Sequence, residues 1–137
     1  MHDLIRRINY YETDKMGITH HSNYIRFMEE ARLHFLDKCG CGLKKFEEMG
    51  VTSPVVSVEC EYKFPTTFDD EIKISISVEG YTGVKLMLSY EITNTQTGKI
   101  VCLGKSSHCF INEKGVPISV RKHFPEFDAL LKSLAKK

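Results

Sequence analysis

The chain lacks an excess of charge of either sign, a long apolar run and a leader-like start. Its 137 residues include 19 basic and 18 acidic side chains, which gives a formal net charge of +1. Without a basic field, the sequence gives no indication of nucleic-acid binding. No apolar run reaches the length of a membrane span, and residues 1–7 lack the apolar core of a signal peptide. We therefore expect neither membrane insertion nor secretion.

The sequence also lacks an even cysteine framework. Its five cysteines are odd in number and mostly lie in apolar patterns, which favours free thiols in a reducing compartment and predicts a cytoplasmic protein. There are no repeats, low-complexity tracts or linkers. A chain of this length is large enough for one hydrophobic core, so a single domain is predicted over residues 1–137.

An amphipathic helix is predicted to begin near Tyr24. Ser22 or Asn23 is the expected N-cap, and Gly40 and Gly42 mark the expected end. Apolar side chains recur between these limits at three- and four-residue steps, as on the buried stripe of a helix. They are Phe27, Met28, Ala31 and Phe35.

Most of the remaining chain follows the rhythm of strands. Segments with alternating apolar and polar residues predict antiparallel strands that bury one face each. They cover residues 56–64, 72–78, 84–92 and 100–111. Also predicted are a first strand over 4–11, a short helix over 43–49 and a final helix over 120–134, broken near Pro125. A mostly antiparallel sheet and one apolar helix face can bury each other if the sheet wraps the helix, which is an α+β arrangement.

The segment from Tyr11 to Tyr24 holds the residues best suited to chemistry. Asp14 follows a strand-like run, the chain turns at Gly17, and two histidines precede the helix. A carboxylate can act as nucleophile or base. A helix N-terminus offers unpaired N–H groups and partial positive charge. Together these groups can polarise and attack a carbonyl, so acyl chemistry is predicted.

Each residue of this segment also has a purely structural interpretation. Asp14 can be a turn-forming aspartate. His20 and His21 can cap or pack at the helix entrance, and Asn23 is a capping candidate first and a substrate contact second.

Other kinds of site are not favoured. Asp14, His20, His21 and Glu29 could ligate a metal, but adjacent histidines point to different faces and the spacing is not His-Glu-x-x-His, so no metal is expected. Cys39-Gly40-Cys41 is not the redox spacing Cys-x-x-Cys. The neighbours His108 and Cys109 face opposite ways on a strand, which argues against a cysteine nucleophile. There is no Gly-x-Ser-x-Gly elbow of a serine hydrolase.

A family resemblance emerges from these motifs. The run 11–24, followed by Glu29-Glu30-Ala31-Arg32, resembles the hotdog-fold acyl-CoA thioesterases of the 4-hydroxybenzoyl-CoA thioesterase-like branch. Segments 64–70 and 110–117 are similar to the same family, and the resemblance spans nearly the whole chain. It implies a hotdog fold, in which an antiparallel sheet wraps a long central helix. It also implies an acyl-CoA thioester hydrolase that releases a free carboxylic acid and coenzyme A.

The resemblance assigns roles by position. Asp14 matches the catalytic carboxylate of the family, and His21 matches a histidine beside the thioester. The backbone from Ile18 to His21 matches the segment that hydrogen-bonds the thioester carbonyl. The residues expected to contact substrate are Gly17, Ile18, Thr19, His20 and Asn23.

The sequence departs from the family pattern at three positions. Glu12 stands where aspartate is more usual, His20 where an aromatic residue is frequent, and Met16 where a small residue is common. The catalytic acid is kept, and the preferred acyl group stays open.

The resemblance also implies partners and leaves alternatives. It implies no cofactor, and a homo-oligomer (a dimer or a dimer of dimers, hence a homotetramer) with the site at a subunit interface. The phosphates of coenzyme A need basic partners, and the sequence singles out none among Lys63, Lys105, Arg121 and Lys122. An acyl-carrier-protein thioesterase and a non-catalytic acyl-thioester binding protein are the alternatives. A hotdog dehydratase resembles a different motif layout.

Overall fold

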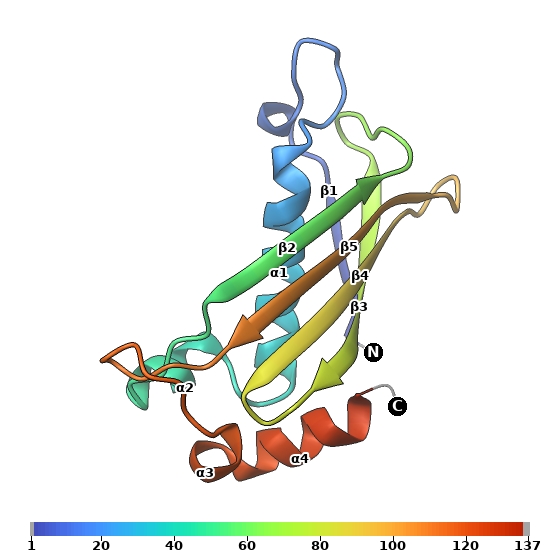
Figure 1. Cartoon of the computed structure of the whole chain (residues 1–137). Helices are drawn as coiled ribbons and strands as arrows, with labels where there is room; N and C mark the ends of the chain where they lie inside the picture. Colours follow the sequence, from blue (N-terminus) through green and yellow to red (C-terminus); the bar gives the residue numbers. More distant parts are fainter. Residues whose placement is uncertain (1, 136–137) are drawn as a thin grey trace.

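The computed structural model describes residues 2–135 as one antiparallel sheet, a long helix against it and shorter helices at one end (Figure 1). The strands are β1 (Leu4–Arg7), β2 (Val55–Tyr62), β3 (Glu71–Tyr81), β4 (Lys85–Asn94) and β5 (Ile100–Cys109). The helices are α1 (Ser22–Lys38), α2 (Leu43–Glu48), α3 (Val120–His123) and α4 (Pro125–Leu134), with a 3₁₀ turn, η1, at Tyr10–Glu12.

The strands lie in the order β1-β3-β4-β5-β2, and all neighbouring pairs are antiparallel. Tyr90 of β4 stands opposite Ile76 of β3 on one side and Gly104 of β5 on the other. Inward residues of β3 and β4 are almost fully buried, as their alternating pattern predicts. β1 and β2 form the two edges of the sheet.

Helix α1 crosses the inner face of the sheet, so its apolar stripe forms the centre of the core (Figure 1). The predicted stripe of Phe27, Met28, Ala31 and Phe35 is buried. Met28 comes so close to β5 that a Cβ at Gly104 would lie 2.7 Å from its sulfur. The sheet therefore wraps the helix, and the predicted α+β layout is confirmed.

The limits of α1 differ in part from the prediction. The helix begins at Ser22, after His21, and neither Ser22 nor Asn23 is its N-cap. The Asn23 side chain instead donates from Nδ2 to the carbonyl oxygen of Glu12, 2.8 Å away, so it serves the preceding loop. At the other end, Gly40 has a φ of 79° and follows the last turn, as predicted.

The first strand is shorter than predicted. It ends at Arg7, and residues 10–12 form η1 instead of continuing the strand. The cause is local, because the carboxylate of Glu12 accepts the N–H of Asn9 while the N–H of Glu12 donates to the Asn9 carbonyl. These paired bonds close a turn that strand alternation does not reveal.

The prediction that β2 buries one face is wrong. Val56, Val58 and Tyr62 remain 54%, 42% and 47% exposed, because β2 lies at the edge of the sheet and meets α1 only where the two cross, near the middle of the strand (Figure 1). The predicted helix over 43–49 and the break near Pro125 are confirmed. Within residues 2–135, no helix is long and apolar enough to cross a membrane.

Candidate active site

A cavity of about 370 Å³ opens where the Asp14 loop, the start of α1 and the end of β2 meet. One wall comes from the loop and α1, and contains Asp14, Met16, Ile18, Thr19, His21 and Tyr24. The other comes from the end of β2 and the residues after it, and contains Tyr62, Lys63, Phe64 and Pro65. The cavity thus joins one carboxylate and one imidazole to a mostly apolar and aromatic surface.

Asp14 lies on a small hairpin that projects from the body of the molecule. Thr13 and Thr19 form its bridge, and the Asp14 N–H donates to the carbonyl of Ile18 at 2.9 Å. The turn closes at Gly17, which has a φ of 78° that favours glycine. One carboxylate oxygen of Asp14 accepts the Met16 N–H at 2.8 Å, so the side chain is held in a defined orientation.

The backbone between Ile18 and His21 offers two kinds of N–H group. Those of Thr19 and His20 are bonded to the carbonyl oxygens of Thr66 and Glu12, at 2.8 and 2.9 Å. Those of Ile18 and His21 have no acceptor among residues 2–135. The His21 N–H stands directly before the first turn of α1, where the helix dipole adds partial positive charge.

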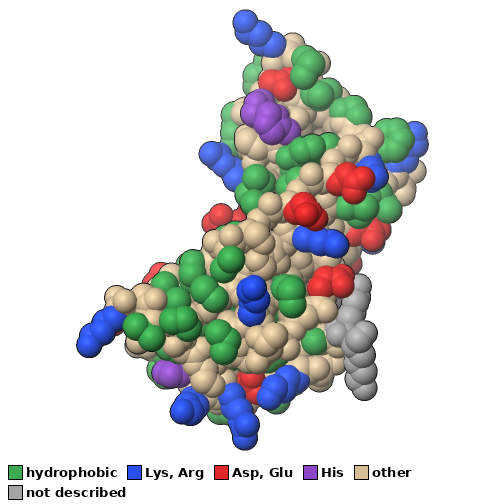
Figure 2. Space-filling view, viewed as in Figure 1, with side chains coloured by type: hydrophobic (Ala, Val, Ile, Leu, Met, Phe, Trp, Pro, Cys, Tyr) green, Lys and Arg blue, Asp and Glu red, His purple; other side chains and the backbone are tan. Residues whose placement is uncertain are grey.

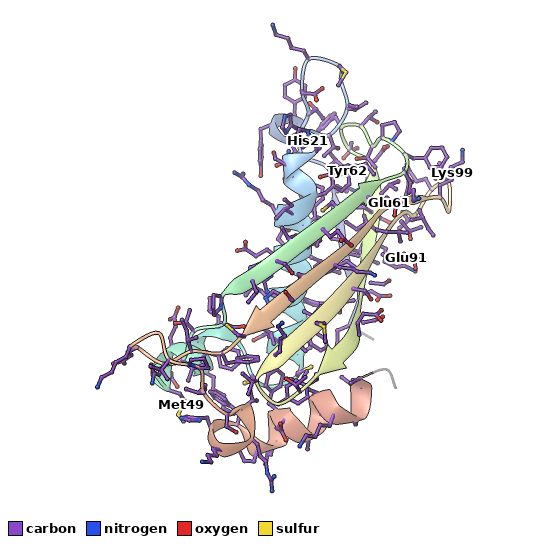
Figure 3. All side chains as sticks on the ribbon, viewed as in Figure 1. His21, Met49, Glu61, Tyr62, Glu91 and Lys99 are labelled. Carbon is purple, nitrogen blue, oxygen red and sulfur yellow. The ribbon has the colours of Figure 1, made fainter. Side chains whose placement is uncertain are left out.

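The two histidines occupy different positions at this entrance. Their rings stack with centroids 4.3 Å apart. The ring of His20 hydrogen-bonds through Nδ1 with the Ser22 hydroxyl at 2.8 Å and does not line the cavity. His21 does line it, and its ring meets that of Tyr62 edge-on, with centroids 6.1 Å apart. Figure 3 shows His21 and Tyr62 at the same end of the molecule, one from the helix entrance and one from β2.

Three buried hydroxyl groups, those of Thr19, Tyr24 and Thr66, form a hydrogen-bonded cluster beside the cavity. The hydroxyls of Thr19 and Thr66 lie 2.6 Å apart, and that of Tyr24 lies 2.9 Å from the Thr66 hydroxyl. Burial raises the pKa of Tyr24 above its usual value, so the phenol stays protonated at neutral pH. The cluster holds two lining residues of the cavity, Thr19 and Tyr24, in place and joins the hairpin to the segment after β2.

Of the wall from β2, the sequence named only Lys63, as one of several possible partners for the phosphates of coenzyme A, and did not predict Tyr62, Phe64 or Pro65 as site residues. The Tyr62 hydroxyl donates to the carbonyl of His21 at 3.2 Å and so links this wall to the helix entrance. Desolvation raises the pKa of Tyr62 to about 12, which keeps the hydroxyl a donor. Lys63 lies 2.5 Å from a carboxylate oxygen of Glu61. The Lys99 ammonium sits over the Phe64 ring, 4.6 Å from its centroid. The sequence does hold a signal that could have indicated this wall. Two aromatic residues and one charged residue follow one another at the end of a strand, in the run Tyr62-Lys63-Phe64-Pro65.

The structure brings together part of the predicted set. Asp14, Ile18, Thr19 and His21 line the cavity, while Gly17, His20 and Asn23 do not. The roles of all seven residues stay predictions. Within residues 2–135, no group of three or more His, Cys, Asp or Glu side chains is arranged to hold a metal ion.

Of the basic residues considered for coenzyme A, Lys63 alone lines the cavity. Lys105 lines a separate hollow of the sheet, beside Ser57 and Met87. Arg121 and Lys122 lie on α3, which packs with α4.

An antiparallel sheet that wraps one long helix, with a cavity at the start of that helix, defines this chain as an α+β protein with one candidate active site. Residues 8–131 match the family model of the thioesterase-like superfamily. The chain belongs to this superfamily, and it is a hydrolase enzyme with the hotdog fold.

Individual relatives agree with the family assignment. The chain is 36% identical over 121 residues to a putative acyl-CoA thioesterase, YneP, of Bacillus subtilis, covering 88% of this chain and 87% of the relative. It is 34% identical over 121 residues to a putative esterase of Aquifex aeolicus, covering 88% and 92%. The solved structure of a DHNA-CoA thioesterase from Staphylococcus aureus has a TM-score of 0.90 at 30% identity, covering 96% of this chain and 91% of that one. The resemblance stated from the sequence is thus confirmed.

Proposed function

We propose that this enzyme hydrolyses acyl-CoA thioesters in the cavity beside Asp14. The observation that carries the proposal is the meeting of the Asp14 carboxylate, the His21 imidazole and an apolar wall in one cavity at the start of α1. The printed names of its relatives in Bacillus subtilis and Staphylococcus aureus support coenzyme A as the thiol component.

The proposed mechanism begins with the carbonyl oxygen of the thioester. This oxygen accepts hydrogen bonds from the free N–H groups at the helix entrance, of which the His21 N–H lies at the positive end of α1. Negative charge that develops on the oxygen is then stabilised by donors already in place. Loss of one such donor costs about 3–4 kcal/mol of barrier.

Asp14 provides the second part of the mechanism by one of two routes. As a nucleophile, it attacks the carbonyl carbon and expels the thiolate, and water then hydrolyses the mixed anhydride. As a general base, it removes a proton from a water molecule that attacks directly. Both routes consume one water and release a carboxylic acid and a thiol. The bond from the Met16 N–H holds one carboxylate oxygen and leaves the other available for either route.

The acyl group is proposed to lie against the aromatic wall. Tyr24, Tyr62 and Phe64 contribute rings to the cavity, and such surfaces favour apolar groups over water. A panel of short-chain, long-chain and aromatic acyl-CoAs, followed by thiol release, identifies the preferred group. Parallel assays with acyl-carrier-protein substrates separate the two thiol components.

We also propose that the enzyme is a homo-oligomer of the cytoplasm. The exposed β2 edge supports self-association. All five cysteines are free thiols, which fits a reducing compartment.

The decisive test replaces Asp14 by asparagine. Asp14→Asn keeps an acceptor for the Met16 N–H but removes the negative charge, so we expect hydrolysis to fall by about 1,000-fold or more, within the range found when a catalytic group is lost. Acyl-CoA turnover and thermal unfolding are measured in parallel. Asp37→Asn is the control, because Asp37 is an exposed aspartate at the far end of α1. A folded Asp14→Asn enzyme with normal turnover would overturn the proposal.

A further inference from the structure

The side chain of Arg6 joins three parts of the molecule beneath the Asp14 hairpin. Although Arg6 lies on the edge strand β1, its side chain is only 13% exposed. One guanidinium nitrogen lies 2.5 Å from the carboxylate of Glu12, and another lies 2.6 Å from that of Glu30 on α1. The guanidinium also stacks over the ring of Phe27, 4.3 Å from its centroid.

Glu12 connects the ion pair with Arg6 to the hairpin. Glu12 is 6% exposed, and its carboxylate accepts the Asn9 N–H in addition to binding Arg6. Its carbonyl oxygen accepts both the His20 N–H and the Asn23 Nδ2–H, at 2.9 and 2.8 Å. One residue therefore closes the hairpin at its base and ties that base to the first turn of α1.

The position of Asp14 in the cavity depends on the residues at the base of the hairpin, Glu12 and His20. Beyond Glu12 and His20, the two arms are joined by the Thr13–Thr19 bridge and by the bond from the Asp14 N–H to Ile18. Asp14 is thus two residues from the base on one arm, and His21 directly follows it on the other. A change in the pose of Glu12 alters the geometry between the carboxylate and the helix entrance.

A contribution to stability alone does not explain why Arg6, Glu12 and Glu30 form a partly buried cluster of charges beneath the Asp14 hairpin. A buried ion pair loses much of its attraction to desolvation, and apolar side chains of similar size are often as stable. A guanidinium that binds two carboxylates in fixed directions adds geometric definition that apolar packing does not provide.

We propose that Arg6 and Glu12 are positioning residues that hold the Asp14 hairpin in its catalytic pose. This inference rests on the proposed function, in which Asp14 is the catalytic carboxylate. Neither Arg6 nor Glu12 lines the cavity, so both act through the hairpin and not on the substrate.

The test compares Glu12→Gln with Glu71→Gln in the full-length enzyme. Glu12→Gln keeps the side-chain length and the backbone bonds but loses the charge that binds Arg6. Glu71→Gln is the matched control, because it removes the same charge from a solvent-exposed ion pair. Glu71 on β3 lies 3.9 Å from the guanidinium of Arg7, the residue after Arg6 on β1. A misplacement of about 1 Å can cost on the order of 100-fold in rate. We therefore expect the kcat of Glu12→Gln to fall roughly 10- to 100-fold with little change in KM, and that of Glu71→Gln to stay at the wild-type level.

Amide hydrogen exchange separates positioning from the proposed chemistry. The N–H groups of Asp14 and His20 are expected to exchange faster in Glu12→Gln than in Glu71→Gln, by more than the difference in global stability of the two variants, which urea unfolding measures. Unchanged exchange with unchanged kcat would overturn the positioning role and leave the proposed function intact. Normal turnover by Asp14→Asn would instead overturn the proposed function, whatever the exchange rates.

A second variant covers the case in which Glu12→Gln does not fold. Arg6→Lys keeps the positive charge, but a single ammonium cannot reproduce the fork that binds Glu12 and Glu30 together. We expect the same loss of kcat and the same faster exchange in the hairpin. Wild-type kcat and exchange in a folded Arg6→Lys enzyme would overturn the proposal.

Discussion

At the scale of single residues, Asp14 combines a structural task with the chemistry proposed for it. Its carbonyl accepts the Gly17 N–H, and its carboxylate accepts the Met16 N–H, so the residue makes the turn on which it stands. The same bond orients the carboxylate toward a fixed direction. The turn-forming and catalytic interpretations are therefore compatible, because one oxygen is used for each.

His108 is a buried residue whose protonation should couple stability to pH. It is fully buried on β5, its Nε2 bonds with the Ser106 hydroxyl at 2.7 Å, and Nδ1 has no partner among the described residues. Burial, together with the nearby Arg32 charge, lowers the pKa of His108 from 6.5 to about 4. Between these values the unfolded chain binds a proton that the folded chain does not. The free energy of unfolding should therefore fall by about 2 kcal/mol between pH 7 and pH 5.

Urea unfolding at several pH values tests this prediction against two histidine variants. His108→Gln removes the titrating group and should flatten the dependence on pH between 7 and 5, even if it lowers stability overall. His34→Gln retains His108 and should keep the wild-type slope. An unchanged slope in His108→Gln would show that other groups cause the pH dependence.

Only one wall of the site could be predicted from the sequence. Asp14 and His21 lie within eight residues of each other, so a local motif reveals both. Tyr62 at the end of β2 and Phe64 just after it reach the same cavity from about 40 residues later, and only the crossing of β2 over α1 places them there. The burial of Glu12 was also not predictable, because it depends on the pairing with Arg6 across the end of β1.

At the scale of secondary-structure elements, periodicity predicted buried faces well where an element has neighbours on both sides. The inward residues of β3 and β4 and the stripe of α1 are buried as expected. The alternation in β2 is equally clear in the sequence, yet Val56 and Val58 stay exposed. Alternation states which residues share a face of a strand, and tertiary structure decides whether that face is covered.

The C-terminal helices are held by an aromatic cluster around Phe46 of α2. Phe46 is fully buried, and its ring contacts those of Phe110, Phe124 and Phe127, with centroids 4.9 to 6.0 Å apart. Phe46→Ala should lower the free energy of unfolding by about 3–5 kcal/mol. Because Phe46 does not line the cavity, turnover per folded molecule should stay near the wild-type value.

Chemical unfolding and active-site titration measure these two effects separately. Phe68→Ala is the control, because Phe68 is 57% exposed and its truncation should cost less than about 1 kcal/mol. A Phe46→Ala enzyme with wild-type stability would contradict the anchoring role of the cluster.

At the scale of the whole molecule, the two edge strands of the sheet differ in how readily they can pair with a second copy of the chain. β1 is short and carries Arg6 and Arg7, and short, charged edges resist pairing. β2 is eight residues long and exposes Val55, Val56 and Val58. On the face shown in Figure 2, hydrophobic side chains gather around the start of β2, and acidic side chains lie farther along the strand. The longer and more apolar edge is therefore the one expected to meet a second copy.

The last prediction follows from this asymmetry. Val58→Lys places a charge in the middle of β2, and two copies paired along this edge would bring two lysines together. We expect the mass in solution, measured by light scattering, to fall toward the 15.7 kDa of one chain. Ile5→Lys is the matched control, since Ile5 is an apolar residue, 58% exposed, on the opposite edge. An oligomer that persists in Val58→Lys but dissociates in Ile5→Lys would assign the interface to β1. If turnover falls together with mass in Val58→Lys, the cavity beside Tyr62 depends on the second copy, because Tyr62 ends the strand along which the two copies are expected to pair.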